Sequence, residues 1–153
     1  LLGREPRGTF DVVVRDSTGD PVVIRNAPLL DDGTPMPTRF YLVGVDLVRD
    51  VSRLEADGGV ARAEAAVDAD ELVAVHARYA AEREEAIPAM HAGPRPSGGV
   101  GGTRRGVKCL HAHVAHSLAG GDDAVGRWTL ARLAERGVRV DASPVVDQGP
   151  AVR

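Results

Sequence analysis

The fold class of this chain is decided by residues 9–26, which read TFDVVVRDSTGDPVVIRN. Two runs rich in β-branched residues, 9–15 and 21–26, flank the segment DSTGD at 16–20. β-Branched runs favour strands, whereas Asp, Ser and Gly favour a turn between them. The pattern predicts a β-hairpin with a five-residue loop.

A third strand is expected at residues 39–43, which read RFYLV. It follows a segment, 28–38, that holds three prolines and a glycine and is therefore predicted to be a loop. Three strands that share one apolar face must bury that face against another layer. The rest of the chain is expected to supply this layer as helices.

Four candidate helices follow, each with a start or stop signal. Asp46 can cap the first, the pair Asp68 and Glu71 forms a capping box for the second, and Asp122 or Asp123 can cap the fourth. The expected ranges are 46–57, 68–86, 107–119 and 122–137. Residues 88–106 are rich in Gly and Pro and are predicted to be a mobile loop, and 138–153 a disordered tail.

The sequence therefore predicts one α+β domain over residues 1–137, as the length of 153 residues allows. A small antiparallel three-stranded sheet, from 8–45, packs against three to four helices from 46–137. Because the sequence opens at Leu1 rather than Met, it does not fix the native N-terminus.

Composition excludes several classes of function. The 19 basic residues are all arginine except Lys108, and they are scattered among 22 carboxylates, so the chain has no basic stripe for nucleic acid. No apolar run approaches the roughly 18 residues of a membrane span, and no leader opens the chain. A single cysteine, Cys109, excludes an intrachain disulfide and an all-cysteine zinc site. We expect a cytoplasmic protein.

The chemistry concentrates in residues 107–119, VKCLHAHVAHSLA, which hold Cys109 and the histidines His111, His113 and His116. Zinc prefers four tetrahedral N, S or O ligands, and Cys-x-His followed by a later His offers three. The competing interpretation is purely structural. In it, His111 is a hydrogen-bonded core residue, His113 and His116 are exposed, and Cys109 packs as a small hydrophobic side chain.

A second chemical interpretation is a thiol-dependent enzyme acting on a small or phosphorylated substrate. Cys109 at a helix start, beside Lys108, would have a lowered pKa and act as the nucleophile. His116 or His111 would act as its base. A third alternative is a protein-interaction domain that binds no ligand.

The second helix carries His76, Tyr79 and Arg83 on one face. These residues could bind an anion or support the region of Cys109. A solvated edge of an amphipathic helix is the interpretation that the spacing favours.

Several segments together resemble the actinobacterial domain-of-unknown-function family 501. The motifs that carry the resemblance are Leu2-Gly3-Arg4-Glu5-Pro6-Arg7-Gly8, Asp32-Gly33-Thr34-Pro35-Met36-Pro37-Thr38 before Phe40-Tyr41-Leu42, Ser52-Arg53-Leu54-Glu55-Ala56, the trio His76, Tyr79 and Arg83, Val107-Lys108-Cys109-Leu110-His111, and Ala115-His116-Ser117-Leu118-Ala119. The family has no established activity, so the resemblance implies a cytoplasmic protein rather than a reaction. It marks Arg4, Arg7 and Lys108 as further motif residues.

This chain departs from the family where typical members carry more cysteines. Typical members are similar in having Cys-Pro-Cys-Gly in the first hairpin and Thr-Cys-Pro after the third strand. At these two places this chain has DSTG (16–19) and VGV (43–45). The comparison implies a divergent member with an ancestral metal site. Cys109, His111 and His116 remain as ligands, with Asp16 as an oxygen ligand and zinc as the expected metal. Our prediction is a non-catalytic module built around this Cys/His site, facing the hairpin loop from the start of the third helix.

Overall fold

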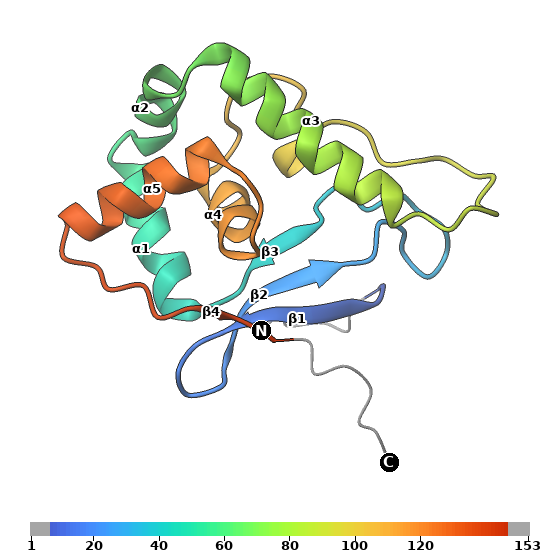
Figure 1. The fold of residues 1–153 in the computed structure, drawn as a ribbon, viewed down its shortest axis with the longest axis horizontal. Coiled ribbons are helices and arrows are strands. Elements are labelled where there is room, and N and C mark those ends of the chain that lie inside the picture. The colour runs from blue at the N-terminus through green and yellow to red at the C-terminus, as the bar shows by residue number, and fades with distance from the viewer. Residues whose placement is uncertain (1–6, 147–153) are drawn as a thin grey trace.

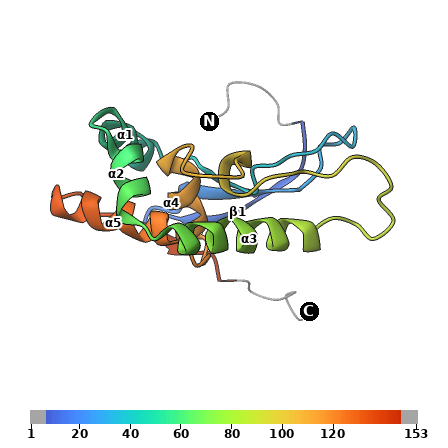
Figure 2. The same cartoon turned by 90° about the horizontal axis from the view of Figure 1, so that it is seen from above.

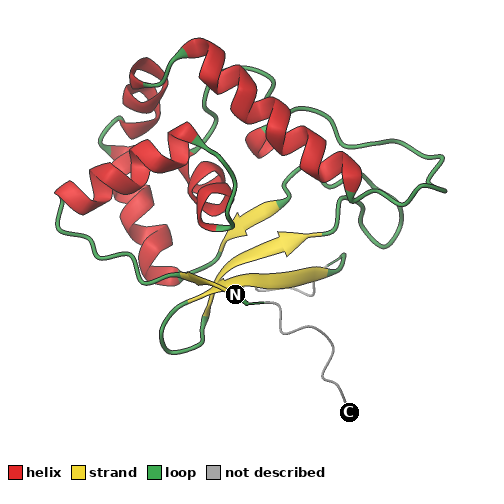
Figure 3. Ribbon diagram, in the orientation of Figure 1, coloured by secondary structure: helices red, strands yellow, loops and turns green. Residues whose placement is uncertain are grey.

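The computed structural model of this chain describes residues 7–146. Within that range the sheet has four strands in the order β3-β2-β1-β4, and all neighbouring strands are antiparallel. They are β1 (Phe10–Arg15), β2 (Pro21–Asn26), β3 (Phe40–Leu42) and β4 (Ser143–Pro144). The helices lie together on one side of this sheet (Figures 1 and 3). The predicted α+β class is therefore confirmed.

The predicted hairpin is formed by β1 and β2. Their register runs from Phe10 opposite Asn26 to Arg15 opposite Pro21, with an irregularity around Val14. In the loop, one carboxylate oxygen of Asp16 accepts hydrogen bonds from the backbone N–H groups of Thr18 and Asp20. Gly19 has a φ of +91°, which a residue without a Cβ adopts at no steric cost. The loop is therefore stabilised by its own first residue.

The fourth strand corrects two predictions, the three-stranded sheet and the disordered tail from 138. Ser143–Pro144 pairs with the edge of β1, and Val138 and Val140 pack against the core. Asp141 accepts hydrogen bonds from the backbone N–H and hydroxyl of Ser17. These two valines attach the segment before β4 to the core, so the chain beyond α5 is ordered as far as the described residues extend. Residues 147–153 lie outside the described part.

Five helices form the second layer within the described residues. They are α1 (Val45–Ala56), α2 (Gly59–Ala66), α3 (Ala69–Glu85), α4 (Leu110–Leu118) and α5 (Ala124–Glu135). The first, second, third and fourth predicted helices correspond to α1, α3, α4 and α5. The sequence did not predict α2, because its residues GVARAEAA bury only Gly59 and Ala63 and so carry almost no apolar period.

The innermost helix is α4, which packs against β3 on one side and α5 on the other (Figures 1 and 2). Six of its nine residues are buried. Leu54 of α1, Tyr79 of α3 and Leu133 of α5 are fully buried around it. Side chains on α4 are therefore held by the core of the protein. None of the described helices combines the length and apolar character that crossing a membrane requires.

The segment 88–106, predicted to be a mobile loop, contains one short 3-10 turn, η1 (Val100–Gly102). Its second half is attached to α3 by hydrogen bonds. Val100 is buried, its N–H donates to His76, and the carbonyl of Gly98 accepts from Arg83. This half of the segment therefore has a defined path that leads directly to Cys109.

Candidate functional site

The predicted ligands Cys109, His111, His116 and Asp16 lie in three different environments. Cys109 and His111 stay together at the start of α4, as predicted, and Glu55 of α1 joins them. His116 is paired with Asp123, and Asp16 belongs to the hairpin loop. The structure thus brings two of the four together and replaces the other two with one carboxylate that the sequence analysis missed.

The three side chains of Glu55, Cys109 and His111 form what we call the Cys–His–Glu cluster. Each offers one donor atom, and these atoms all lie within 4.8 Å of one another. Glu55 Oε1 lies 3.1 Å from His111 Nδ1 and accepts a hydrogen bond from the backbone N–H of Leu110. All three residues are half-buried. Within residues 7–146 no other Cys, His, Asp and Glu side chains converge in this way.

Backbone geometry explains why the cluster forms here. Cys109 is the N-cap of α4 and has extended φ and ψ angles, so its side chain does not follow the helix. Its side chain makes no capping hydrogen bond, and the Glu55 carboxylate caps the first turn instead. Glu55 comes from the last turn of α1 and precedes Cys109 by 54 residues. No sequence spacing connects these two helices, so the pairing could only come from tertiary structure.

His111 has an unusual electrostatic environment. The interaction with the Cys109 side chain raises its pKa from 6.5, burial opposes this, and the Glu55 carboxylate adds to the increase. On the other side of the ring, Nε2 lies 3.0 Å from Ser52 Oγ and 3.2 Å from the carbonyl oxygen of Val48. A raised folded-state pKa contributes stability below pH 6.5 that is lost as the pH rises through that pKa. The cluster therefore favours a positive charge at this position.

A pocket of about 390 Å³ adjoins the cluster, and we call it the β3–α4 pocket. Its lining includes Cys109 and His111 together with residues of β3, of α1 and of the turn before α4. The lining residues are Thr38, Phe40, Tyr41, Leu42, Val48, Gly101, Lys108, Cys109, His111 and Ala112. The cluster is thus half-buried but accessible from a cavity of ligand size.

His113 and His116 are buried, so the expectation that both are exposed was wrong. The Nδ1 atom of His113 lies 2.9 Å from both carboxylate oxygens of Asp123, and that of His116 lies 2.8 Å from Oδ2. His116 also stacks on Phe40 and meets Tyr79 edge-on. A Cβ at Gly121 would lie 2.1 Å from His116 Nε2, so only glycine fits beside this ring. His116 therefore packs in the core and is not among the side chains that converge on Cys109.

Asp123 is fully buried at the N-cap of α5. Burial alone would raise its pKa, but hydrogen bonds from His113, His116 and the backbone N–H of Gly126 lower it well below the ordinary value of 3.8. Because an ionised carboxylate only accepts hydrogen bonds, both histidines donate from Nδ1–H. The Nε2 atom of His113 has no hydrogen-bond partner among the residues that the structure describes. This trio ties α4 to α5.

His76, Tyr79 and Arg83 are also buried, which corrects the favoured interpretation of a solvated helix edge. His76 accepts from the N–H of Val100 at Nδ1 and donates from Nε2 to the carbonyl of Gly106. Arg83 donates to the carbonyls of Pro37 and Gly98. The face of α3 therefore supports the segment before Cys109, as the alternative interpretation proposed.

The hydroxyl of Tyr79 accepts hydrogen bonds from the backbone N–H groups of Arg39 and Phe40. Burial raises the pKa of Tyr79, so the hydroxyl stays neutral. Arg7, a motif residue near the N-terminus, forms an exposed ion pair with Asp32. Arg4 lies outside the described residues. The structure places neither Tyr79 nor Arg7 in a reactive site.

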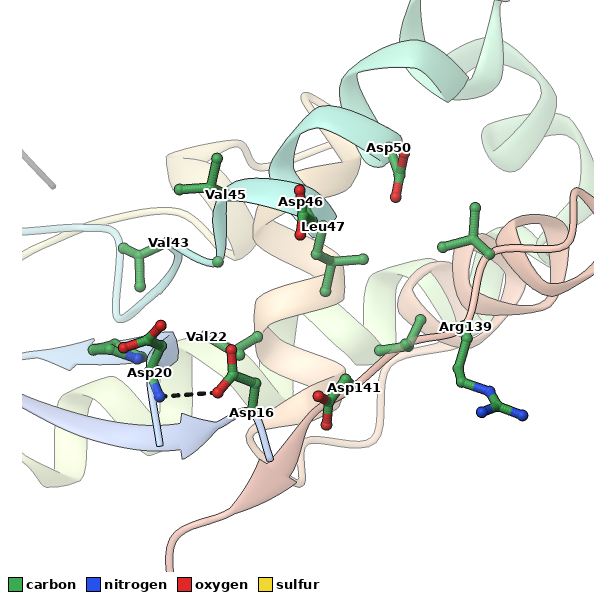
Figure 4. Close-up of a pocket in the computed structure, with 14 residues that line it drawn as sticks. Asp16, Asp20, Val22, Val43, Val45, Asp46, Leu47, Asp50, Arg139 and Asp141 are labelled. Carbon is green, nitrogen blue, oxygen red and sulfur yellow. Dashed lines mark hydrogen bonds between the residues drawn. The ribbon is translucent and has the colours of Figure 1, made fainter. Parts of the chain in front are cut away.

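Asp16 lines a different pocket, of about 380 Å³, between the hairpin loop and the start of α1 (Figure 4). The segment after β3, Val43–Gly44–Val45, lines the same pocket, whereas Cys109 does not. The two places where the family resemblance put further cysteines therefore meet here, away from the Cys–His–Glu cluster. Hydrogen bonds from Thr18, opposed by slight desolvation, lower the pKa of Asp16. The predicted convergence of hairpin and helix on one metal is not observed.

Comparison with known proteins gives one match. The sequence model of the family described as "Protein of unknown function (DUF501)" matches residues 12–131. No curated protein and no solved structure matches this chain.

Proposed function

This chain belongs to the DUF501 family of proteins of unknown function, and we propose that it is a non-catalytic module that binds a divalent metal ion, zinc first, through Cys109, His111 and Glu55. The observation that carries the proposal is the convergence of three donor atoms within 4.8 Å. Thiolate, imidazole and carboxylate are the side chains from which proteins build zinc sites. Relative to the ligand set predicted from sequence, Glu55 takes the place of Asp16 and His116.

The spacing of the donors supports this proposal. Zinc bonds of about 2.0–2.3 Å in a tetrahedron place ligand atoms roughly 3.3–3.8 Å apart. Glu55 Oε1 and His111 Nδ1 are 3.1 Å apart, so a small outward movement of either side chain would accommodate the ion. The Cys109 side chain is free of a capping role and can turn toward it.

The charges also support it. A thiolate and a carboxylate carry two negative charges, which a divalent ion neutralises while His111 binds as neutral imidazole. In the absence of metal, a proton on His111 supplies part of the compensating charge, as the raised pKa of this residue indicates. Metal and proton therefore compete, and zinc affinity is expected to increase as the pH rises from about 6 to about 8.

The first test measures zinc in protein purified without a metal-binding tag, followed by titration against a competing chelator. We expect one zinc per chain. Changes to residues that only support a metal ligand cost about 10–100-fold in affinity, so Cys109→Ser and Glu55→Gln should each cost about 100-fold or more. His91→Ala is the matched control, because His91 lies in the loop after α3 and contacts the carbonyl of Pro94. Equal zinc binding by Cys109→Ser and the control would place the metal elsewhere.

A thiol-dependent enzyme remains the second candidate, and one observation favours it. The donor atoms of Cys109 and His111 lie within 4.8 Å of each other, which brings a thiol and a candidate base together. His116, the other base suggested by the sequence, is bound to Asp123. The enzyme would therefore use His111 alone as its base.

Alkylation by iodoacetamide near neutral pH separates the two candidates. A metal-bound sulfur is masked, so we expect slow labelling of Cys109 in the purified protein, faster labelling after chelation, and slow labelling again after zinc is restored. Fast labelling of untreated, metal-free protein would establish the thiol enzyme instead. Slow labelling with and without chelator, in protein that contains no metal, would leave only the structural interpretation, in which Cys109 is an inert, packed side chain.

Three finer expectations stay predictions. They are the cytoplasmic location, the actinobacterial origin and the divergence of this chain from other family members. The proposal of a single metal-binding domain does not depend on any of them.

A further inference from the structure

We propose that the β3–α4 pocket binds a small organic anion whose carboxylate or phosphate group occupies the open fourth position of the metal. The apolar part of this ligand would lie along the wall formed by β3. This inference rests on the proposed metal site, and it adds the chemical class of the ligand that the site recognises.

The first observation is the position of the cluster at the wall of the pocket. Cys109 and His111 line the pocket, whereas Glu55 of α1 does not. Three protein ligands leave one tetrahedral position of zinc open. Since two of the three ligands form the pocket wall, the open position faces the cavity. A metal exposed in this way takes a water molecule or an anionic ligand.

The second observation is positive charge at the pocket, which would attract an anion. Lys108 lines the pocket, and its Nζ lies 3.3 Å from the carbonyl of Gly101 on the same side. The first turn of α4 also begins at the pocket, and the N-terminal end of a helix bears partial positive charge. Only the first N–H of this turn, that of Leu110, is used by Glu55. An anionic group at the metal would therefore lie between the metal, Lys108 and the helix start.

The third observation is that part of the pocket lining is apolar. Phe40 and Leu42 of β3, Val48 of α1 and Ala112 of α4 form this part. The ring of Tyr41 is 44% exposed at the edge. A volume of about 390 Å³ lies in the range of small-molecule sites, roughly 300–1,000 Å³, and exceeds what an inorganic ion fills. The pocket therefore fits an anion with an apolar or aromatic body.

Binding of the anion should depend on the metal. Without metal, Nδ1 of His111 is paired with the Glu55 carboxylate, so the cluster offers an anion no open coordination position. With a divalent ion bound, the negative charges of Glu55 and of the Cys109 thiolate are neutralised, and the metal itself attracts the anion. Metal and anion are thus coupled, each strengthening the binding of the other.

The test uses full-length protein loaded with cobalt(II), whose visible spectrum reports both the metal and its fourth ligand. Appearance of thiolate-to-cobalt absorption tests the metal site. Benzoate and phenyl phosphate are then titrated, with acetate and inorganic phosphate as probes that lack the aromatic body. We expect the cobalt spectrum to change with each anion, and the aromatic members of both pairs to bind about tenfold more tightly. The better of the two aromatic anions identifies carboxylate or phosphate as the preferred group.

Lys108→Met is expected to weaken anion binding about tenfold while cobalt affinity stays unchanged. Arg105→Met is the matched control, since it removes one exposed positive charge from the same segment without touching the pocket. Cobalt binding without any spectral response to the four anions would overturn this inference and leave the metal site intact. Absence of cobalt binding would instead overturn the proposed function. The anion-binding inference would also be overturned by equal affinities for aromatic and non-aromatic anions, or by equal anion binding to the metal-free protein.

Discussion

Asp123→Ala is expected to lower the free energy of unfolding by about 3–5 kcal/mol, because it leaves several buried hydrogen-bond donors without an acceptor. Asp123 is fully buried and accepts hydrogen bonds from His113, His116 and the N–H of Gly126. Alanine leaves both histidine Nδ1–H groups without their acceptor in the core and removes the cap of α5. Chemical denaturation of the purified variant, followed by circular dichroism, measures the loss.

Asp122→Ala is the matched control for this prediction. Asp122 is the neighbouring residue, but its side chain is 60% exposed and pairs with arginines at the surface. We expect its replacement to leave the unfolding free energy almost unchanged. Similar losses for the two variants would contradict the assignment of Asp123 as the residue that joins α4 to α5.

Asp123→Asn separates the charge from the cap, because its side-chain oxygen can still accept from Gly126. The hydrogen bonds that lower the pKa of Asp123 contribute stability above the ordinary value of 3.8, and this contribution is lost as the pH falls toward the folded-state pKa. The difference in unfolding free energy between the native protein and Asp123→Asn should therefore be constant near neutral pH and narrow below pH 3.8. If this difference in unfolding free energy increased below pH 3.8, the conclusion that Asp123 is ionised in the folded protein would be wrong.

The sheet was predictable because its signals are local. Residues 9–26 contain both strands and the turn chemistry, and Asp16 and Gly19 act within the loop that they predict. The fourth strand had no such signal, because Ser143–Pro144 is only two residues long and contains a proline. What decides this strand is the open edge of β1, which is 130 residues away in the chain by numbering.

The candidate site was predictable only in part, for a related reason. Cys109 and His111 are two residues apart, so their proximity is a local property of the start of α4. Glu55 meets them only because α1 and α4 pack together. The family resemblance includes Glu55 in a motif, but nothing in the sequence places that motif beside Cys109. The separation of His116 from Cys109 arises in the same way. Asp123, after the next turn, provides a closer partner for His116 than any metal shared with Cys109.

Arg83→Met is expected to lower the free energy of unfolding by about 2–4 kcal/mol, because it removes two hydrogen bonds from a charged donor. Arg83 is 3% exposed, and its guanidinium donates to the carbonyls of Pro37 and Gly98. Methionine retains most of the apolar stem, so the loss reports the polar contacts rather than a cavity. Denaturant titration measures this loss.

The same substitution should also loosen the segment that leads to the Cys–His–Glu cluster. Gly98 precedes η1, whose Gly101 lines the β3–α4 pocket, so amide hydrogen exchange at Val100 and Thr103 should accelerate in Arg83→Met. Arg78→Met is the matched control on the same helix, since its guanidinium also donates to a backbone carbonyl, that of Asp122, and pairs with Glu71, but its side chain is 38% exposed and water can replace these contacts. It should change neither stability nor exchange to a comparable extent. Equal effects of the two variants would show that Arg83 contributes no more than a surface arginine, and the support of this segment would then rest on His76 alone.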